Sequence, residues 1–292
     1  MSTFESLSVE TLTKDLRSLG YIADRGLTTS LFIAMKLGRP ILLEGEVGVG
    51  KTELAKTLAQ LYKRQLIRLQ CYEGIDTNHA LYEWDYARQM LQIRALTQNQ
   101  VSETSVEQLF GPKFLIERPL LQAIRAGDQC VLLIDEIDRA DDEFEAFLLE
   151  LLSDFQITIP EIGTIKAQSR PIVILTSNRT RELHDALKRR CLYSWIGFPN
   201  PEQEIEIVHS RLPGISHLLT EKVVTAVNRL REMELEKSPG VAETLDWVES
   251  LNAIGAQDLN VENAAETLGS VIKSRDDLEY TTKNLKDVVS GV

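Results

Sequence analysis

The residues most able to do chemistry form one glycine-rich segment, residues 45–52, which reads GEVGVGKT. Glycines leave the backbone free of side chains, so the amides of such a loop can approach phosphate oxygens closely. Lys51 would place its ammonium group on the β- and γ-phosphates, and the Thr52 hydroxyl could ligate Mg²⁺. The alternative is a glycine turn that binds nothing. The pattern predicts that a nucleoside triphosphate is bound by Gly45, Glu46, Val47, Gly48, Val49, Gly50, Lys51 and Thr52.

Two acids end an apolar run further along the chain, in residues 130–136 (CVLLIDE). Parallel strands bind ligands at their carboxyl ends, so acids at the end of a buried strand would face the ligand. We expect Asp135 to hold the magnesium shell and Glu136 to orient and deprotonate the attacking water. GTPases commonly use a glutamine for that water, so the acid pair favours ATP as the substrate. The alternative is that the two acids are ordinary surface residues, in contact with water at the end of the strand.

Two further polar elements follow. Asn178 ends the apolar run ILTSN, where its amide could stand between the γ-phosphate and the water; the alternative is an asparagine that forms a turn. The segment LHDALKRRC presents Arg189 and Arg190 at a predicted helix end. Such an arginine could reach the nucleotide of a neighbouring subunit and neutralise transition-state charge. Arg190 is the stronger candidate and Arg189 the second; the alternative is an ordinary basic cluster at a helix C-terminus.

The elements that position these residues follow from apolar spacing. Residues 24–38 have helical spacing and end in a glycine, and a short apolar strand, PILLEG, leads into the glycine-rich loop. Helix formers follow the loop from Lys51, and residues 66–71 form a second strand candidate. Two continuous apolar runs, CVLLIDE and IVILTSN, are typical of central parallel strands. The pattern predicts an α/β fold with a central parallel sheet flanked by helices.

The chain changes character at residues 198–204 (FPNPEQE), after which only helical segments follow. We therefore expect an α/β nucleotide-binding core over residues 1–199 and an all-helical lid over residues 200–292. Within the core, residues 72–113 form an insertion with a polar loop over residues 97–108. Alternating apolar residues around Pro160 and Gly163 predict a β-hairpin over residues 155–168.

Composition excludes several classes of function. The chain has 292 residues and a net charge of −12, and from Asn200 onward 17 acidic residues face 9 basic ones. This charge repels phosphate backbones, so nucleic acid is a poor default partner. No apolar run approaches the roughly 20 residues that cross a bilayer, and the first ten residues lack the layout of a secretory signal. Cys71, Cys130 and Cys191 form no Cys-x-x-Cys pair, so we expect reduced, buried thiols in a cytoplasmic protein.

The glycine-rich loop, the acid pair, Asn178 and the basic segment LHDALKRRC occur in this order and are followed by a helical lid. This arrangement resembles an AAA+ ATPase over essentially the whole chain. The insertion resembles the helix-2 insert of that superfamily, and the hairpin resembles its insert before the sensor-1 strand. Both inserts are found in the MoxR family. The segments LIRLQCYEGID, ALYEWDYARQML and SNRTRELHDALKRRCLYSWIGFP are similar to CoxD-like members, which mature a molybdenum-containing CO dehydrogenase.

The resemblance implies roles for several residues. Asp135 and Glu136 would form the second Walker motif, Asn178 would be sensor 1, Arg190 would be the finger, and Ile22 would contact adenine. It also implies ATP and Mg²⁺ as ligands, a hexameric ring, a partner with a von Willebrand factor A domain, and a molybdenum hydroxylase as client. Many members carry an arginine, sensor 2, where the lid helix begins. Here that segment reads KSPGVAETLDW, without an arginine.

Three functions stay open. The leading one is an ATP-driven chaperone that remodels a protein client and does not insert stably into a membrane. The second is a nucleic-acid motor or loader, against which the insertion argues, because residues 72–108 contain only two basic residues, Arg88 and Arg94, beside six acidic ones. The third is a nucleotide-gated scaffold that binds ATP without needing turnover.

Overall fold

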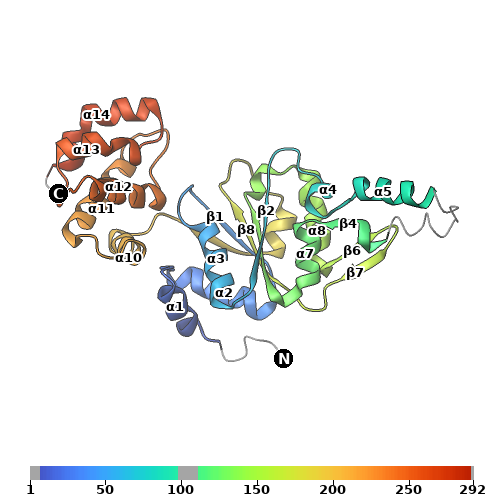
Figure 1. The fold of residues 1–292 in the computed structure, drawn as a ribbon. Coiled ribbons are helices and arrows are strands. Elements are labelled where there is room, and N and C mark those ends of the chain that lie inside the picture. The colour runs from blue at the N-terminus through green and yellow to red at the C-terminus, as the bar shows by residue number, and fades with distance from the viewer. Residues whose placement is uncertain (1–6, 98–110, 291–292) are drawn as a thin grey trace. The chain divides into compact units, whose positions relative to one another are not determined.

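The computed structural model describes residues 7–97 and 111–290 (Figure 1). Contacts divide the chain into two compact units. The sheet unit comprises Met1–Val9, Gly26–Glu44 and Leu54–Ser194, and the helical unit comprises Glu10–Arg25, Gly45–Glu53 and Trp195–Val292. These units do not coincide with the predicted division into residues 1–199 and 200–292, because residues 45–53 are grouped with the C-terminal helices. That division therefore stays a prediction.

A five-stranded sheet forms the centre of the sheet unit. β1, β8 and β5 are parallel neighbours, and β2 pairs in parallel with β5. The predicted α/β fold with a central parallel sheet and C-terminal helices is therefore confirmed. In sheet order the strands are β2 (Gln65–Gln70), β5 (Cys130–Asp135), β8 (Ile172–Ser177), β1 (Ile41–Gly45) and β9 (Leu192–Ile196).

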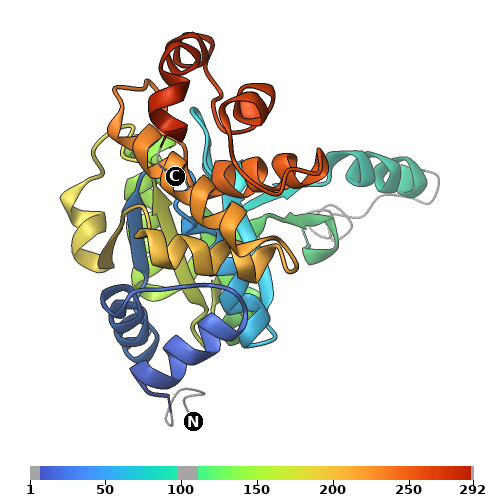
Figure 2. The same cartoon turned by 90° about the vertical axis from the view of Figure 1, so that its left-hand side faces the viewer.

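The two central strands, β5 and β8, are buried along their whole length. Parallel strands covered on both faces read as continuous apolar runs, which is why both could be predicted from the sequence. Helices run alongside the sheet (Figures 1 and 2). Those of this part of the chain are α2 (Arg25–Leu37), α3 (Lys51–Leu61), α7 (Pro119–Ala126), η3 (Gly127–Gln129), η4 (Ile137–Arg139), α8 (Asp142–Asp154) and α9 (Asp185–Arg190).

The insertion has a small sheet of its own, in which β3 pairs antiparallel with β4. α5 extends away from the central sheet in both ribbon views (Figures 1 and 2). The predicted polar loop lies outside the described residues, except for Thr97 at the end of α5. The elements are α4 (Thr77–Ala80), β3 (Tyr82–Trp84), α5 (Tyr86–Thr97), η2 (Pro112–Phe114) and β4 (Leu115–Glu117). The predicted hairpin is present as β6 (Gln156–Ile159) and β7 (Gly163–Lys166), which pair antiparallel.

The helical unit packs its C-terminal helices around Trp247, which is fully buried and donates from Nε1 to Thr267 Oγ1 at 2.8 Å. Helix α10 begins after the proline-rich segment because Asn200 and Gln203 form a capping box. Its helices are α10 (Pro201–Arg211), α11 (His217–Glu232), α12 (Val241–Ala253), α13 (Val261–Thr267), η5 (Leu268–Ser270) and α14 (Arg275–Val289). Near the N-terminus, α1 (Val9–Ser18) lies mostly in the same unit.

A buried ion pair joins the first helices of this unit. The Glu204 carboxylate is fully buried and accepts two hydrogen bonds from Arg231, at 2.7 and 2.8 Å. The same carboxylate accepts from Thr244 Oγ1 at 2.6 Å. The arginine stacks over Phe198, with its guanidinium carbon 4.4 Å from the ring centre. The pair therefore connects α10, α11 and α12 and the segment before α10.

Replacing Glu204 with glutamine should lower the free energy of unfolding by about 3 kcal/mol, because Arg231 would keep a buried charge without its counter-ion. Urea titration measures this difference. The matched control is Glu202→Gln on the exposed first turn of the same helix, which should change stability by less than about 0.5 kcal/mol. Equal stability of the two variants would contradict the prediction.

In the described part of the chain, no helix combines the length and the apolar composition that a membrane span needs. The three cysteines are free and buried, as expected. Burial raises the thiol pKa of Cys71 and Cys191 to about 12 and that of Cys130 to about 11. These thiols therefore serve as small core residues and not as nucleophiles.

Candidate active site

The glycine-rich loop joins the end of β1 to the start of α3. Gly48 and Gly50 have φ of +79° and +92°, a backbone conformation that only glycine adopts without strain. Lys51 is 6% exposed, and its Nζ donates to the carbonyl oxygens of Gly45 at 2.7 Å and Glu46 at 2.6 Å. The ammonium group is thus held over the loop itself.

Two of the loop's glycines also touch protein backbone. A Cβ atom on Gly45 would stand 2.0 Å from the carbonyl oxygen of Ile196. A Cβ atom on Gly48 would stand 3.1 Å from the Cα of Gly240. Close packing therefore requires glycine at position 45, and at position 48 the tight approach adds to the preference for glycine that the positive φ already sets, independently of any ligand.

The donor set of this segment fits a triphosphate. It combines the N-terminal amides of α3, an 11-residue helix, with the Lys51 ammonium and the Thr52 hydroxyl. Tyr21 is buried beside the loop, with its Cε2 atom 3.9 Å from the position of a Cβ on Gly50. Ile22, the residue predicted to contact adenine, follows it and is half-buried.

The first acid of the predicted pair, Asp135, is almost completely buried at the end of β5. Its Oδ2 accepts a hydrogen bond from Arg68 Nε at 2.9 Å, and its Oδ1 accepts from Thr176 Oγ1 at 2.5 Å. The arginine comes from β2 and the threonine from β8, the two strands beside β5. Both carboxylate oxygens are thus engaged by neighbouring strands.

The second acid, Glu136, has a left-handed backbone, with φ of +54°. Its amide donates to Thr176 Oγ1 at 2.9 Å. Its Oε2 accepts from Gln70 Nε2 at 2.9 Å and lies 3.0 Å from Arg139 Nε, and its Oε1 accepts from Asn178 Nδ2 at 3.4 Å. The structure thus brings together Glu136 and Asn178, two of the residues predicted from the sequence.

Sequence reasoning missed the contribution of β2. Arg68 and Gln70 are two residues apart on this strand and reach the two acids of β5 from the same side. The signal that could have found them is the alternation of polar and apolar residues in LIRLQ. That alternation marks a half-buried strand but does not show which neighbour its polar face meets.

The acids after β5 and the end of β1 belong to one edge of the sheet by strand order. β5, β8 and β1 are parallel neighbours, so their carboxyl ends lie at the same edge. Ser177 at the end of β8 donates to the buried carboxylate of Glu44 at the end of β1, at 3.3 Å. The loop begins at the next residue, Gly45.

The two finger candidates, Arg189 and Arg190, are exposed at the C-terminal end of α9. Arg39, two residues before β1, donates to the carbonyl oxygen of Arg189 at 2.8 Å and to that of Arg190 at 3.2 Å. The last carbonyls of a helix lack partners within the helix, so this arginine caps α9. The contacts of Arg39 hold the end of α9 in place, and the side chains of Arg189 and Arg190 stay exposed.

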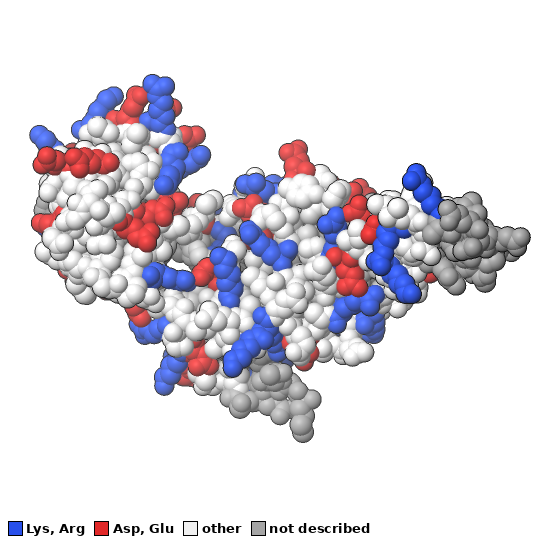
Figure 3. Space-filling view, in the orientation of Figure 1, with Lys and Arg blue, Asp and Glu red and all other residues white. Residues whose placement is uncertain are grey.

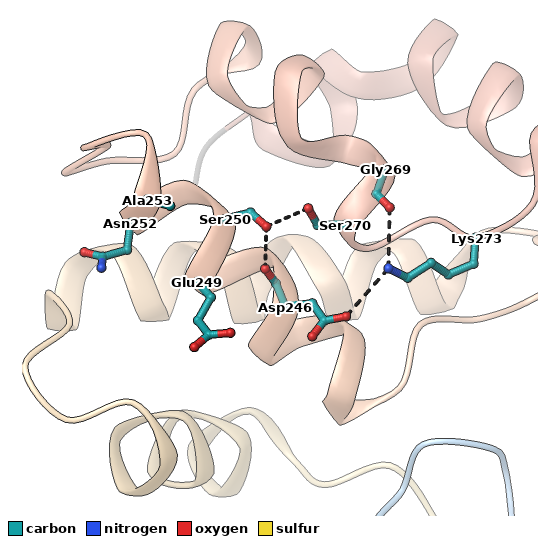
Figure 4. A pocket seen from close by; sticks show the side chains of 8 residues that line it. All are labelled: Asp246, Glu249, Ser250, Asn252, Ala253, Gly269, Ser270 and Lys273. Carbon is teal, nitrogen blue, oxygen red and sulfur yellow. Dashed lines mark hydrogen bonds and ion pairs between the residues drawn. The ribbon is translucent and has the colours of Figure 1, made fainter.

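A separate hollow of about 640 Å³ lies in the helical unit (Figure 4). Its one basic side chain, Lys273, is already 3.6 Å from Asp246 and is oriented toward the carbonyl of Gly269. Lys273 is thus already engaged by groups of the lining itself. It consists of Asp246, Glu249, Ser250, Asn252, Ala253, Gly269, Ser270 and Lys273.

The described residues also contain no group of three or more His, Cys, Asp or Glu side chains that could hold a metal ion by themselves. Mg²⁺ usually keeps several waters and binds through one or two protein groups together with substrate phosphates. The Thr52 hydroxyl and the Asp135 carboxylate are ligands of the kind that this ion takes, and a protein cage is not needed.

Comparison with known proteins places this geometry in a family. A family model described as AAA domain (dynein-related subfamily) matches residues 40–191. The gas vesicle ATPase GvpN of Haloferax mediterranei is 25% identical over 277 residues, which cover 88% of this chain and 77% of that protein. The uncharacterized protein YojN of Bacillus subtilis is 30% identical over 179 residues, or 59% of this chain and 52% of that protein.

Among solved structures, a RuvB mutant of Thermotoga maritima covers 99% of this chain and 80% of its own, with a TM-score of 0.50 and 18% sequence identity. At that identity the likeness concerns the fold. The family model covers more than half of the chain, including β1, β5 and β8 and the residues at their carboxyl ends. The chain therefore belongs to the AAA-domain family of the dynein-related subfamily, and it is an ATPase.

Proposed function

We propose that this ATPase is a MoxR-type AAA+ chaperone of the CoxD-like group, which hydrolyses Mg-ATP to remodel a protein client. The client is a molybdenum hydroxylase such as CO dehydrogenase, whose active site it helps to mature. The proposal rests on the MoxR-like inserts and CoxD-like segments of the sequence, together with the contacts of Glu136, after β5, with Gln70 of β2 and with Asn178, after β8.

Each residue at the sheet edge has a role in this proposal. The loop amides and Lys51 hold the phosphates, and Thr52 binds Mg²⁺, which neutralises phosphate charge when present. Asp135 would help to hold the hydrated ion, and Arg68 and Thr176 orient its carboxylate. Glu136 takes the proton of the attacking water, and the Asn178 amide beside it orients that water.

The proposed assembly is a hexameric ring, in which Arg190, or Arg189 beside it, completes the site of the neighbouring subunit. The Arg39 cap supports this role because it fixes the backbone from which both side chains extend. A protein with a von Willebrand factor A domain is the expected partner of the ring.

The surface of α5 is the observation that supports a protein as the client. Tyr86, Met90 and Leu91 on this helix are 63%, 55% and 67% exposed, so the insertion offers apolar side chains to a partner. Arg88 is already engaged, since it donates to the Lys113 carbonyl at 3.1 Å. A nucleic-acid motor would present basic side chains there. Basic and acidic residues are also interspersed over the face seen in Figure 3.

A role in gas vesicles is the second candidate. It is favoured by the similarity to a gas vesicle ATPase, which covers 88% of this chain. Both candidates use the same ATPase core and differ in the client that the insertion contacts.

The client distinguishes the candidates. The Glu136→Gln protein, which should bind ATP without hydrolysing it, is used as bait in MgATP with purified molybdenum hydroxylase, purified gas vesicle protein or a DNA duplex. We expect the hydroxylase to be retained in MgATP and not in nucleotide-free buffer. Adding Leu91→Asp to the bait should reduce retention at least about tenfold, the effect of losing an apolar anchor.

The matched control for the bait is Leu218→Asp, because Leu218 is similarly exposed, at 52%, but lies on α11. It should retain the hydroxylase normally. Retention of the gas vesicle protein would favour the second candidate, and retention of DNA would revive the nucleic-acid motor.

A further inference from the structure

The start of α12 lies against the glycine-rich loop through a main-chain contact, with the Glu243 carboxylate beside it: Glu243 Oε2 is 3.2 Å from the position of a Cβ on Gly48. The amide of Val241 donates to the carbonyl oxygen of Gly48 at 3.0 Å. A Cβ atom on Gly240 would stand 2.8 Å from the Cα of Gly48, closer than such atoms approach. Two glycines therefore face each other where the lid meets the loop.

This hydrogen bond fixes the orientation of one loop peptide. In a trans peptide the carbonyl and the following amide point in opposite directions. With the Gly48 carbonyl directed at α12, the Val49 amide is directed to the opposite side of that peptide. Loop amides are the groups that hold phosphates, so the lid orients one of them.

The start of α12 is itself held firmly. Glu243 Oε2 accepts from the Gly240 amide at 2.9 Å, so this side chain caps the start of its own helix. Thr244 donates to the buried carboxylate of Glu204 at 2.6 Å, and Arg231 Nε donates to the Pro239 carbonyl at 2.8 Å. The ion pair within the helical unit thus secures both sides of the segment that reaches the loop.

We propose that the lid and the phosphate loop sense each other through this main-chain contact between Gly48 and Val241. The contact stands where many MoxR members carry a sensor-2 arginine, while the Glu243 side chain here caps its own helix. The lid then responds to the shape of the loop backbone and not to the charge of the nucleotide. The inference rests on the proposed function only for the statement that ATP occupies the loop.

Val241→Pro tests the contact. Val241 is the first residue of α12, where proline is well tolerated, and Gly240 before it has the extended backbone that a following proline requires. The substitution removes one donor and keeps the helix. The control is Val261→Pro, at the first residue of α13, which is 41% exposed and follows the N-cap residue Asn260.

In the nucleotide-free Val241→Pro protein, we expect the amides of residues 45–52 to exchange hydrogen faster than in wild type. Calorimetry should show about tenfold weaker ATP binding, the effect of losing one orienting hydrogen bond. Val261→Pro should behave like wild type in both. By reciprocity, MgATP should protect the amides at the start of α12 in wild type and less so in Val241→Pro.

A second pair of variants guards against misfolding. Gly240→Ala inserts a methyl group into the contact, and Gly269→Ala adds one on the same unit where nothing lies within 4 Å. The inference would be overturned if Val241→Pro and Val261→Pro had the same hydrogen exchange in residues 45–52 and the same ATP affinity, and if the two alanine variants also matched each other in both measurements. If wild type binds no ATP, the proposed function fails, while loop exchange still tests the contact.

Discussion

Replacing Lys51 with alanine should abolish measurable MgATP binding, raising the dissociation constant more than about 100-fold. Hydrogen bonds to charged groups contribute about 1.5–3 kcal/mol each, and the ammonium of this residue would make several with the phosphates. The side chain is buried over the loop, so solvent does not offset the loss. Isothermal titration calorimetry with MgATP measures the effect.

The control for this variant is Lys56→Ala, which removes a lysine from the exposed side of the same helix. Its affinity for MgATP should stay within about twofold of wild type, as for most surface substitutions. A Lys51→Ala protein that binds MgATP normally would overturn the assignment of the loop.

Replacing Glu136 with glutamine should leave ATP binding intact and lower the turnover rate by about 10³-fold. Glutamine has nearly the same shape, and its one carbonyl oxygen can still accept the shorter of the two hydrogen bonds, the one that Gln70 donates; its amide nitrogen replaces the oxygen that accepts from Asn178. It cannot take a proton from water, and general-base catalysis contributes about 10²–10⁴-fold. Phosphate release under saturating ATP measures turnover, and calorimetry measures binding.

Glu143→Gln on the exposed face of α8 is the matched control and should hydrolyse ATP at the wild-type rate. Glu136→Gln also separates two classes of function. A remodelling chaperone with this substitution loses its biological output although it still binds ATP, whereas a nucleotide-gated scaffold keeps it. Unchanged turnover would remove Glu136 from the catalytic step.

The central strands were predictable because burial on both faces leaves them uniformly apolar. β9 was not expected, because only part of LYSWI is buried and its tyrosine and tryptophan are 49% and 44% exposed. A strand at the edge of a sheet does not have to be apolar on both faces. Its pairing depends on tertiary contacts such as the bond from the Leu192 amide to the Pro40 carbonyl.

The candidate site was predictable as a set of residue types and not as a network. The motif located Lys51 and Glu136, but the contacts of Arg68 and Gln70 depend on how β2 is aligned with β5. The loop glycines were attributed to phosphate contact alone. The structure shows that Gly45 also passes close to another main-chain segment, a constraint that a linear motif does not contain.

The left-handed backbone of Glu136 lowers the stability of the fold at a residue that we propose to act in ATP hydrolysis. A residue other than glycine in this conformation costs on the order of 1 kcal/mol, and the hydrogen bond to Thr176 helps to maintain it. Glycine at this position would relieve that cost but would also remove the carboxylate that accepts from Gln70 and Asn178. On the catalytic role that we propose for Glu136, the strained acid serves ATP turnover, and a lineage that no longer needed turnover would be free to lose it.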